Sequence, residues 1–219
     1  MRLSARFMPL HHSEQEMGTS VLKARKVEIA ETAKLSAVLA KIFQNDPMVV
    51  HLLPDPATRE VRMERVFRLF LQRIYLPHEE CYTLGVFLGG AIWLPPGKHK
   101  PSIWQQLMLL PSALPIVGLS GGLRSFRDLN QMEKMHPKGT PHWYLAFVGV
   151  SPSEQGTGIG SALLQPVLDR CDVERIPAYV ENSNEQNLPF YIKNGFKVVK
   201  ECDIHQGPHL WGMWRAPQA

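Results

Sequence analysis

The chain has 219 residues, 44% hydrophobic and 20% charged, which predicts one globular domain with a sizeable core. Its formal net charge of +4 suits an anionic small ligand, but without a block of lysines or arginines it does not indicate nucleic-acid binding. No segment reaches the roughly 18 apolar residues that a membrane span needs, so we expect no membrane partner.

The first half of the chain predicts a lead-in, a strand and two helices. Residues 1–23 carry no continuous apolar core, so we expect a flexible lead-in that is neither a secretory signal nor an anchor, followed by one domain over 24–219. Lys26–Ala30 alternates as a strand, and Thr32–Gln44 has apolar residues at helical spacing. Pro47 stops that helix, and a second one runs from about Ala57 to Tyr75.

A strand pair and a helical insert come next. Cys81–Leu84 and Gly90–Leu94 read as a short antiparallel pair that ends at Pro95. The insert covers about 102–135 and is apolar, with Pro111 inside it. It would cover the cleft as a lid or form an interface patch.

The second half alternates strands with helices. In chain order we expect a strand, a glycine-rich loop, a helix, a strand, a helix and two strands, over Trp143–Val150, Gln155–Ser161, Gly158–Cys171, Pro177–Val180, Glu185–Asn194, Phe196–Asp203 and His209–Trp214. The whole order predicts an α/β (α+β) fold, a mixed and mostly antiparallel seven-stranded sheet with helices on both faces.

The sequence has three cysteines, Cys81, Cys171 and Cys202. Their odd number and wide spacing predict neither a disulfide framework nor a metal site. Free thiols fit a reducing compartment, so we expect a cytoplasmic protein without a metal cofactor.

The glycine-rich run Gln155-Gly-Thr-Gly-Ile-Gly-Ser161 is the most informative local feature. Between a strand and a helix, backbone N–H groups and the positive helix end can hold a phosphate. A P-loop is excluded because the run has no lysine, and a dinucleotide-binding fingerprint would need glycine where Ser161 stands. A plain glycine-rich turn without a ligand is the alternative.

Two patterns in order make the run more specific. Q-x-x-G-x-G lies at Gln155–Gly160, and N-x-x-F-Y-x-x-x-G-F lies at Asn187–Phe196. With these motifs the chain resembles the GNAT superfamily of N-acetyltransferases. Within it, Pro177–Ser183 and Gly207–Met213 resemble puromycin N-acetyltransferase relatives. The resemblance is detailed over about 143–217 and faint over about 26–96, and it implies the GNAT fold.

The resemblance implies acetyl-CoA as the acyl donor and a binding role for three segments. The pyrophosphate would meet the loop, the pantetheine arm would lie beside the preceding strand, and an asparagine would bond the arm or cap a helix. These residues are Gln155, Gly156, Thr157, Gly158, Ile159, Gly160 and Ser161, then Phe147, Val148, Gly149 and Val150, then Asn187. Gly149 marks either a bulge or a packing contact, and a backbone N–H near Val148 would stabilise the oxyanion.

The resemblance also implies a general acid and a base. Tyr191 matches the tyrosine that protonates the leaving thiolate, and a phenol is protonated at neutral pH. Glu181 ends a strand beside the cleft, so it would act as base or hold the substrate ammonium. Glu80, His142 and Tyr144 are other candidate bases.

The acceptor is the least determined part. Aromatic and apolar residues at Trp93, Trp104, Met108 and Tyr144 are candidates for substrate binding. We therefore expect direct acetyl transfer to a primary amine of a small, partly apolar molecule, in a monomer or homodimer. A protein N-terminal or lysine acetyltransferase and a non-catalytic acetyl-CoA sensor are the alternatives, and the acyl-chain length is open.

Overall fold

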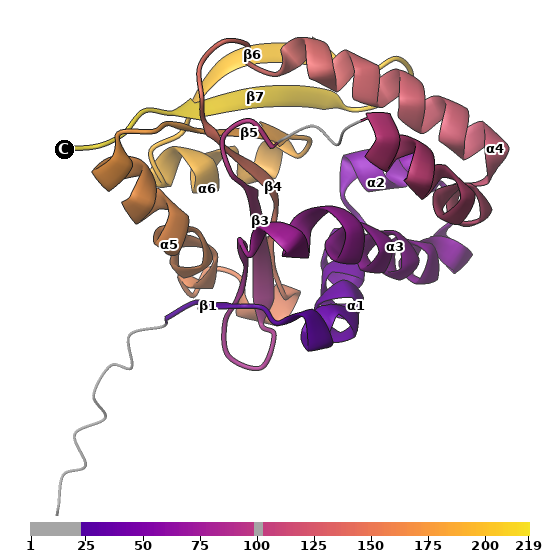
Figure 1. The fold of residues 1–219 in the computed structure, drawn as a ribbon, viewed down its shortest axis with the longest axis horizontal. Helices are drawn as coiled ribbons and strands as arrows, with labels where there is room; N and C mark the ends of the chain where they lie inside the picture. The colour runs from indigo at the N-terminus through magenta and orange to yellow at the C-terminus, as the bar shows by residue number, and fades with distance from the viewer. Residues whose placement is uncertain (1–22, 99–102) are drawn as a thin grey trace, which may run out of the picture.

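The computed structural model describes residues 23–98 and 103–219, apart from the side chains of residues 103–108 and 120. Apart from Lys23, the expected N-terminal lead-in lies outside the described residues. One sheet of seven strands forms the centre, in the order β1-β2-β3-β4-β5-β7-β6 (Figure 1). The strands are β1 Arg25–Lys26, β2 Cys81–Thr83, β3 Gly89–Leu94, β4 Trp143–Val150, β5 Ala178–Asn182, β6 Lys197–Asp203 and β7 His209–Arg215.

The sheet is mixed, as the sequence predicts. All neighbouring strands are antiparallel except β4 and β5, which are parallel. The seven-stranded and mostly antiparallel architecture is therefore confirmed.

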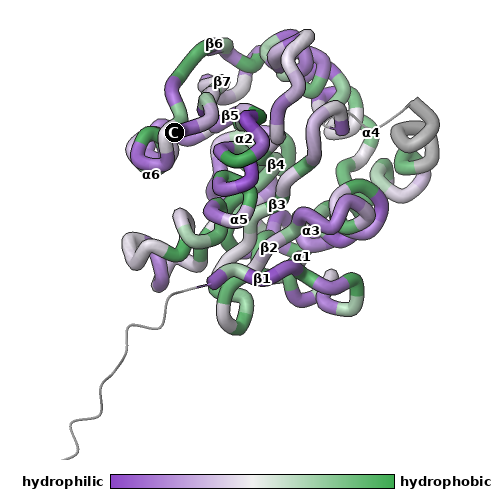
Figure 2. Tube along the Cα trace, turned by 60° about the vertical axis from the view of Figure 1, so that its left-hand side comes forward, coloured by the Kyte–Doolittle hydropathy of each residue, from purple (hydrophilic) through white to green (hydrophobic). Residues whose placement is uncertain are grey.

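Helices cover both faces of the sheet (Figure 1). Their bounds are α1 Thr32–Phe43, α2 Pro47–Leu52, α3 Pro56–Phe70, α4 Ile103–Met135, α5 Ile159–Glu174 and α6 Leu188–Lys193. The core around α5 includes Leu163, Val167 and Trp143, and the core around α1 and α3 includes Leu35, Leu39 and Phe67. The turns of α3 carry mostly hydrophilic residues (Figure 2), which fits a helix that packs one side on the sheet. None of the helices in the described ranges is long and apolar enough to cross a bilayer.

Two N-terminal elements differ from the sequence-based prediction. The first strand is only Arg25–Lys26, because a 3-10 helix begins at Ile29 and is fixed by a capping box between Glu28 and Glu31. Pro47 follows the end of α1 and also begins α2, where the Asp46 carboxylate accepts hydrogen bonds from the backbone N–H groups of Met48 and Val49.

The insert consists of two helices that meet at a kink and share the label α4. α4 runs over 33 residues, and Gly118 has non-helical angles within it (φ 75, ψ 167). Only glycine adopts this backbone at little cost, so α4 changes direction there.

The two parallel strands separate at the centre of the sheet, and this separation positions the site. β4 and β5 pair only at Trp143–Ala178 and Tyr144–Tyr179. β3 stays paired to β4 as far as Val150, with a register shift that leaves Ala146 as the extra residue of β4. The bulge predicted for Gly149 is therefore three residues earlier, at Ala146.

Candidate active site

The loop before α5 has the backbone that its glycines require. Gly156 and Gly158 have positive φ angles of 79° and 88°, and Gly158 is the N-cap of α5. Such angles strain any residue with a Cβ, so glycine is needed at both positions. The first N–H groups of a helix have no acceptor within it, so those at the start of α5 can serve a bound anion.

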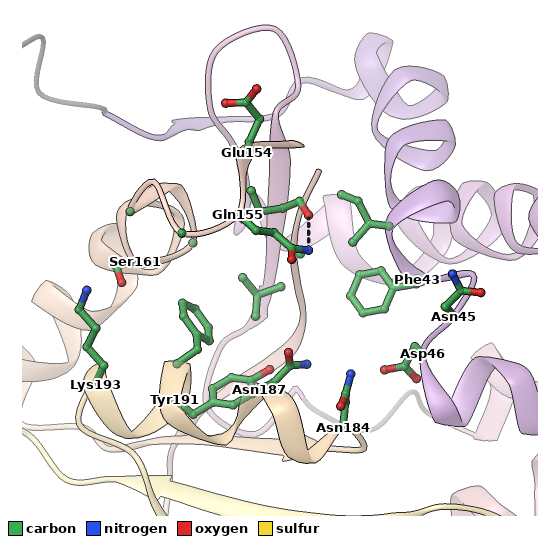
Figure 3. Close-up of a pocket in the computed structure, with 18 residues that line it drawn as sticks. Phe43, Asn45, Asp46, Glu154, Gln155, Ser161, Asn184, Asn187, Tyr191 and Lys193 are labelled. Atoms are coloured by element: carbon green, nitrogen blue, oxygen red, sulfur yellow. Dashed lines mark hydrogen bonds between the residues drawn. The ribbon is translucent and has the colours of Figure 1, made fainter. Parts of the chain in front are cut away.

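Two side chains hold the loop in shape. The Gln155 amide donates to the Val150 carbonyl at 3.3 Å, and the Thr157 hydroxyl donates to the Glu154 carbonyl at 2.6 Å. Figure 3 shows the Gln155 bond at the upper edge of the site. The loop therefore presents mainly its backbone to a ligand.

A pocket of about 380 Å³ opens between this loop, β4, α6 and the α1–α2 connection. Ten of the residues that line it are labelled in Figure 3. Its lining includes Val148, Gly149 and Val150 of β4, together with Gln155, Gly156, Gly158, Gly160, Ser161, Asn187 and Tyr191. The structure thus brings most of the residues predicted for the donor together around one pocket.

Gly149 and Gly160 are close-packed glycines. A Cβ on Gly149 would lie 2.5 Å from Ile42 Cγ2, and one on Gly160 would lie 2.8 Å from Phe190 Cε2. Both distances are too short for a side chain to be added without movement. Gly149 therefore serves the packing role that was the alternative to a bulge.

The side chains of Phe147 and Asn187, which are both predicted to contact the donor, lie in different surroundings. The Phe147 ring packs against Phe43, Phe67 and Tyr75 at centroid distances of 5.6, 5.1 and 6.0 Å. This places its side chain in the core, and only its backbone belongs to the β4 edge. Asn187 lines the pocket, and its side chain makes no capping hydrogen bond to α6.

Tyr191 is buried on the pocket wall, in the first turn of α6. Burial and then the charge of Asp46 raise the pKa of Tyr191 well above its ordinary value. The phenol is therefore protonated throughout the physiological pH range, and it can donate a proton but not accept one. Asp46, the N-cap of α2, faces the pocket (Figure 3). Its carboxylate accepts a hydrogen bond from the Ser183 hydroxyl at 2.9 Å.

Glu181 lies outside this pocket, in a buried cluster beside the strand separation. Its side chain is 3% exposed, and Oε1 lies 3.1 Å from His136 Nδ1. The other oxygen, Oε2, is buried without a partner at normal hydrogen-bond distance in the part of the chain that the structure describes. A buried carboxylate oxygen of this kind has strong capacity to accept a proton or bind an ammonium group.

Two tyrosines face Glu181. Burial and then the charge of Glu181 raise the pKa values of Tyr144 and Tyr179 well above their ordinary range. Their rings are stacked at a centroid distance of 6.5 Å. Tyr144 thus joins the Glu181 cluster, but its hydroxyl stays protonated, which argues against its use as a base.

The remaining candidates are dispersed. Trp93 is fully buried in the core around α5, so it is not available to a substrate, contrary to the expectation for it. Glu80 binds Arg170 and Tyr82 on that same side. The side chains of Trp104 and Met108 lie outside the described residues.

Comparison with known proteins gives consistent matches. Residues 117–196 match the model of the Acetyltransferase (GNAT) family. The uncharacterized N-acetyltransferase C550.08 of Schizosaccharomyces pombe is 28% identical over 192 residues, which are 80% of this chain and 74% of that protein. A Corynebacterium glutamicum structure, described as histone acetyltransferase HPA2 and related acetyltransferase, has a TM-score of 0.70 at 25% identity and covers 90% of this chain and 97% of its own. These matches support the GNAT acetyltransferase family.

The fold is the GNAT fold, which further structures share. Arylalkylamine N-acetyltransferase 2 of Aedes aegypti has a TM-score of 0.61 at 9% identity and covers 90% of this chain and 100% of its own. Its name concerns a small amine, whereas the C. glutamicum protein is named for histones. The GNAT fold is therefore confirmed, while these names do not select one acceptor class.

Sequence reasoning does not identify several of the residues that line the pocket. Lys193 extends from α6 toward Ser161 (Figure 3), where its charge would add to the field of the helix end. Its place two residues after Tyr191 in the second motif is a usable signal. Asn45 and Asp46 reach the pocket from about 100 residues away, and only the helix-start pattern at Asp46-Pro47 marks them.

No group of three or more His, Cys, Asp or Glu side chains that would hold a metal ion occurs within residues 23–98 and 103–219. Cys81 and Cys171 are buried and Cys202 is partly buried, each as a free thiol. Burial raises the pKa of both Cys81 and Cys171 to about 12, so these thiols are unreactive at neutral pH.

Proposed function

We propose that this protein is an acetyl-CoA-dependent N-acetyltransferase that transfers the acetyl group directly to a primary amine of a small, partly apolar molecule. One observation carries the proposal. A single pocket adjoins the separated edge of β4, the N-terminus of α5 and the phenol of Tyr191. In this proposal the β4 edge binds the extended arm of the donor, the α5 N-terminus binds its pyrophosphate, and the phenol protonates its leaving thiolate.

The residues fit coenzyme A. Two glycines at positive φ let the loop backbone approach a pyrophosphate without a Cβ between them. Lys193 adds a cation at the same end of the pocket. The unpaired edge of β4 beyond Tyr144 offers backbone groups to an amide-bearing arm.

Acetyl-CoA supplies a thioester, and the chain supplies positioning and proton transfer. In this proposal the Val148 N–H stabilises the charge that develops on the carbonyl oxygen. Tyr191 donates its proton to the departing sulfur. Glu181 accepts the proton that an ammonium substrate must lose before its nitrogen can attack, and Oε2 is the acceptor atom, because Oε1 is engaged by His136.

The surroundings of Glu181 favour one class of acceptor. The rings of Tyr144 and Tyr179 flank it, and aromatic faces bind cations and apolar groups together. This favours an amine attached to an apolar body. The motif resemblance to puromycin N-acetyltransferase relatives points the same way and stays a prediction.

The test is acetyl-CoA consumption by the purified protein against a panel of acceptors. The panel holds arylalkylamines, aliphatic amines, polyamines, lysine-containing peptides and peptides with a free N-terminus. We expect turnover on small apolar amines, with kcat/KM at least tenfold above that on any peptide. Turnover on peptides alone would show that the acceptor is a protein and not a small amine. Tight acetyl-CoA binding without turnover on any acceptor would favour a sensor.

A further inference from the structure

A carboxylate lies in the pocket that the proposed donor would occupy. Asp46 lines this pocket between the end of α1 and the start of α2. Figure 3 shows its carboxylate and the phenol of Tyr191 directed toward one another from opposite sides of the pocket. After burial, the charge of Asp46 is the second influence that raises the pKa of Tyr191, so the two groups lie within electrostatic reach. A negative charge thus stands beside the proposed acid.

Contacts from two distant parts of the chain fix the orientation of this carboxylate. The backbone N–H groups of Met48 and Val49 donate to Oδ1 at 2.9 and 3.3 Å. The Ser183 hydroxyl, 137 residues away in the chain, lies 3.0 Å from Oδ1 and 2.9 Å from Oδ2. Among the described residues, Ser183 is the one hydrogen-bond partner of Oδ2. Because a carboxylate oxygen can accept more than one hydrogen bond, Oδ2 can also accept from a ligand.

Other carboxylates that are buried in this protein lie beside a cationic side chain. Glu80 is paired with Arg170 at 2.7 Å, and Asp128 with Arg127 at 3.2 Å. Across residues 23–98 and 103–219, no ion pair of this kind involves Asp46. Burial, its largest influence, raises the pKa of Asp46, because desolvation penalises the charged form. A cation bound in the pocket would offset this cost.

We propose that Asp46 binds the ammonium group of the acceptor through Oδ2, in the same pocket as the donor and beside Tyr191. The proposal rests on the proposed function, because it takes the acceptor to be an amine that meets acetyl-CoA there. Asp46 is a binding and specificity residue in this proposal, and Ser183 holds its carboxylate in place. Ser183 follows Glu181 by two residues, so the two carboxylates belong to the same end of β5.

The pocket also offers apolar surface next to Asp46. Ile42 and Phe43, the last two residues of α1, line the pocket three to four residues before it. An ammonium group at the carboxylate would therefore bring an attached apolar body against these two side chains. The charge of Asp46 selects for an ammonium group, whereas the neighbouring side chains select for an apolar carrier.

A change of one charge tests the site without loss of the helix start. Asp46→Asn removes the negative charge and keeps the N-cap of α2, because asparagine caps a helix as well as aspartate does. The probes are 2-phenylethylamine and 2-phenylethanol, in which a hydroxyl replaces the amino group. Their dissociation constants are measured by calorimetry on the full chain saturated with coenzyme A.

We expect the wild type to bind the amine about tenfold or more tightly than the alcohol, because a hydrogen bond between two charged groups is a strong one. In Asp46→Asn the preference should fall below about twofold. Equal affinities of the wild type for the two probes would overturn the ammonium site. A preference that survives in Asp46→Asn would overturn it as well.

Asp55→Asn is the matched control. Asp55 also precedes a proline and caps a helix, α3, where its carboxylate accepts from the Ala57 N–H at 3.1 Å and from the Thr58 hydroxyl at 2.6 Å. It is exposed and does not line the donor pocket. This variant should keep the preference of the wild type for the amine, and similar Tm values for the two variants would show that both are folded.

Kinetics separate this inference from the proposed function. With an accepted amine, Asp46→Asn should raise the KM for the amine about tenfold and leave the KM for acetyl-CoA within about twofold. Turnover by the wild type with an unchanged amine KM in Asp46→Asn would overturn the ammonium site alone. A wild type that prefers the amine in binding but acetylates no amine would overturn the proposed function and leave the binding site standing.

Discussion

The proposed donor side and the proposed acceptor side of the candidate site are built in different ways. The donor pocket uses β4, the loop before α5 and the first turns of α6, and backbone geometry dominates it. The acceptor side gathers Glu181, His136, Tyr144 and Tyr179 from three separate elements, and side chains dominate it. This division suits a site with one donor and varying acceptors. Substitutions easily alter recognition by side chains, whereas recognition by the backbone stays the same.

The division predicts which measured constant each substitution changes. A substitution on the donor side should change kcat or the KM for acetyl-CoA by the same factor with every acceptor. A change near Glu181 should depend on the amine.

Removal of the Tyr191 hydroxyl tests the donor side most directly. Tyr191→Phe should lower kcat about tenfold or more for every amine, because the thiolate must leave without a proton from the phenol. Its KM for acetyl-CoA should stay within about twofold. Tyr82→Phe is the control, because Tyr82 is equally buried but bonds Glu80 at 2.7 Å away from the pocket. Near-wild-type turnover in Tyr191→Phe would remove Tyr191 as the acid.

A methyl group in the loop tests whether the backbone holds the donor. Gly158→Ala should raise the KM for acetyl-CoA about tenfold, which corresponds to about 1.4 kcal/mol, because φ 88° strains alanine and shifts the start of α5. Gly97→Ala has a matched φ of 77° and an equally open surrounding. The two variants should lose similar Tm, and only Gly158→Ala should change the acetyl-CoA KM. An unchanged KM would mean that this loop does not hold the donor.

The same contrast explains how much could be predicted from the sequence. The motifs Gln155–Gly160 and Asn187–Phe196 are each short and have fixed spacing, so local patterns predict the loop and its neighbours, and most of the residues named there line one pocket. His136 and Glu181 are 45 residues apart and meet only through packing of the α4 end on β5. No local spacing marks such a pair, because each partner is determined by the tertiary fold rather than by its neighbours in the chain.

Trp93 also shows a limit of prediction from the sequence, because the direction of its side chain depends on the tertiary fold. The sequence makes Trp93 a candidate for substrate binding, but its side chain points from β3 into the core around α5. Its indole Nε1 is buried without a hydrogen-bond partner in the described part of the chain. Strand direction relative to the cleft requires knowledge of the neighbouring strands, which the sequence alone does not supply.

A charge at the edge of the donor pocket gives a smaller effect. Lys193→Met should raise the KM for acetyl-CoA about threefold to fivefold at low salt and less at 0.5 M salt, because an exposed cation acts through a screened field. Lys197→Met is the control, four residues later on the exposed strand β6. Equal KM values for the two variants would indicate that Lys193 has no part in donor binding.

A buried histidine beside the proposed acceptor side should make the folding stability depend on pH. Burial lowers the pKa of His142 in the folded protein, whereas in the unfolded chain it titrates near about 6.5. Below that pH the unfolded chain binds more protons, so the free energy of unfolding falls as the pH falls toward the pKa of the folded state. His142→Gln removes this contribution and leaves the carboxylates unchanged. Between pH 7.5 and 5 its Tm should therefore fall about 2 °C less than that of the wild type, and an identical fall in the two proteins would show that His142 is not held neutral by burial.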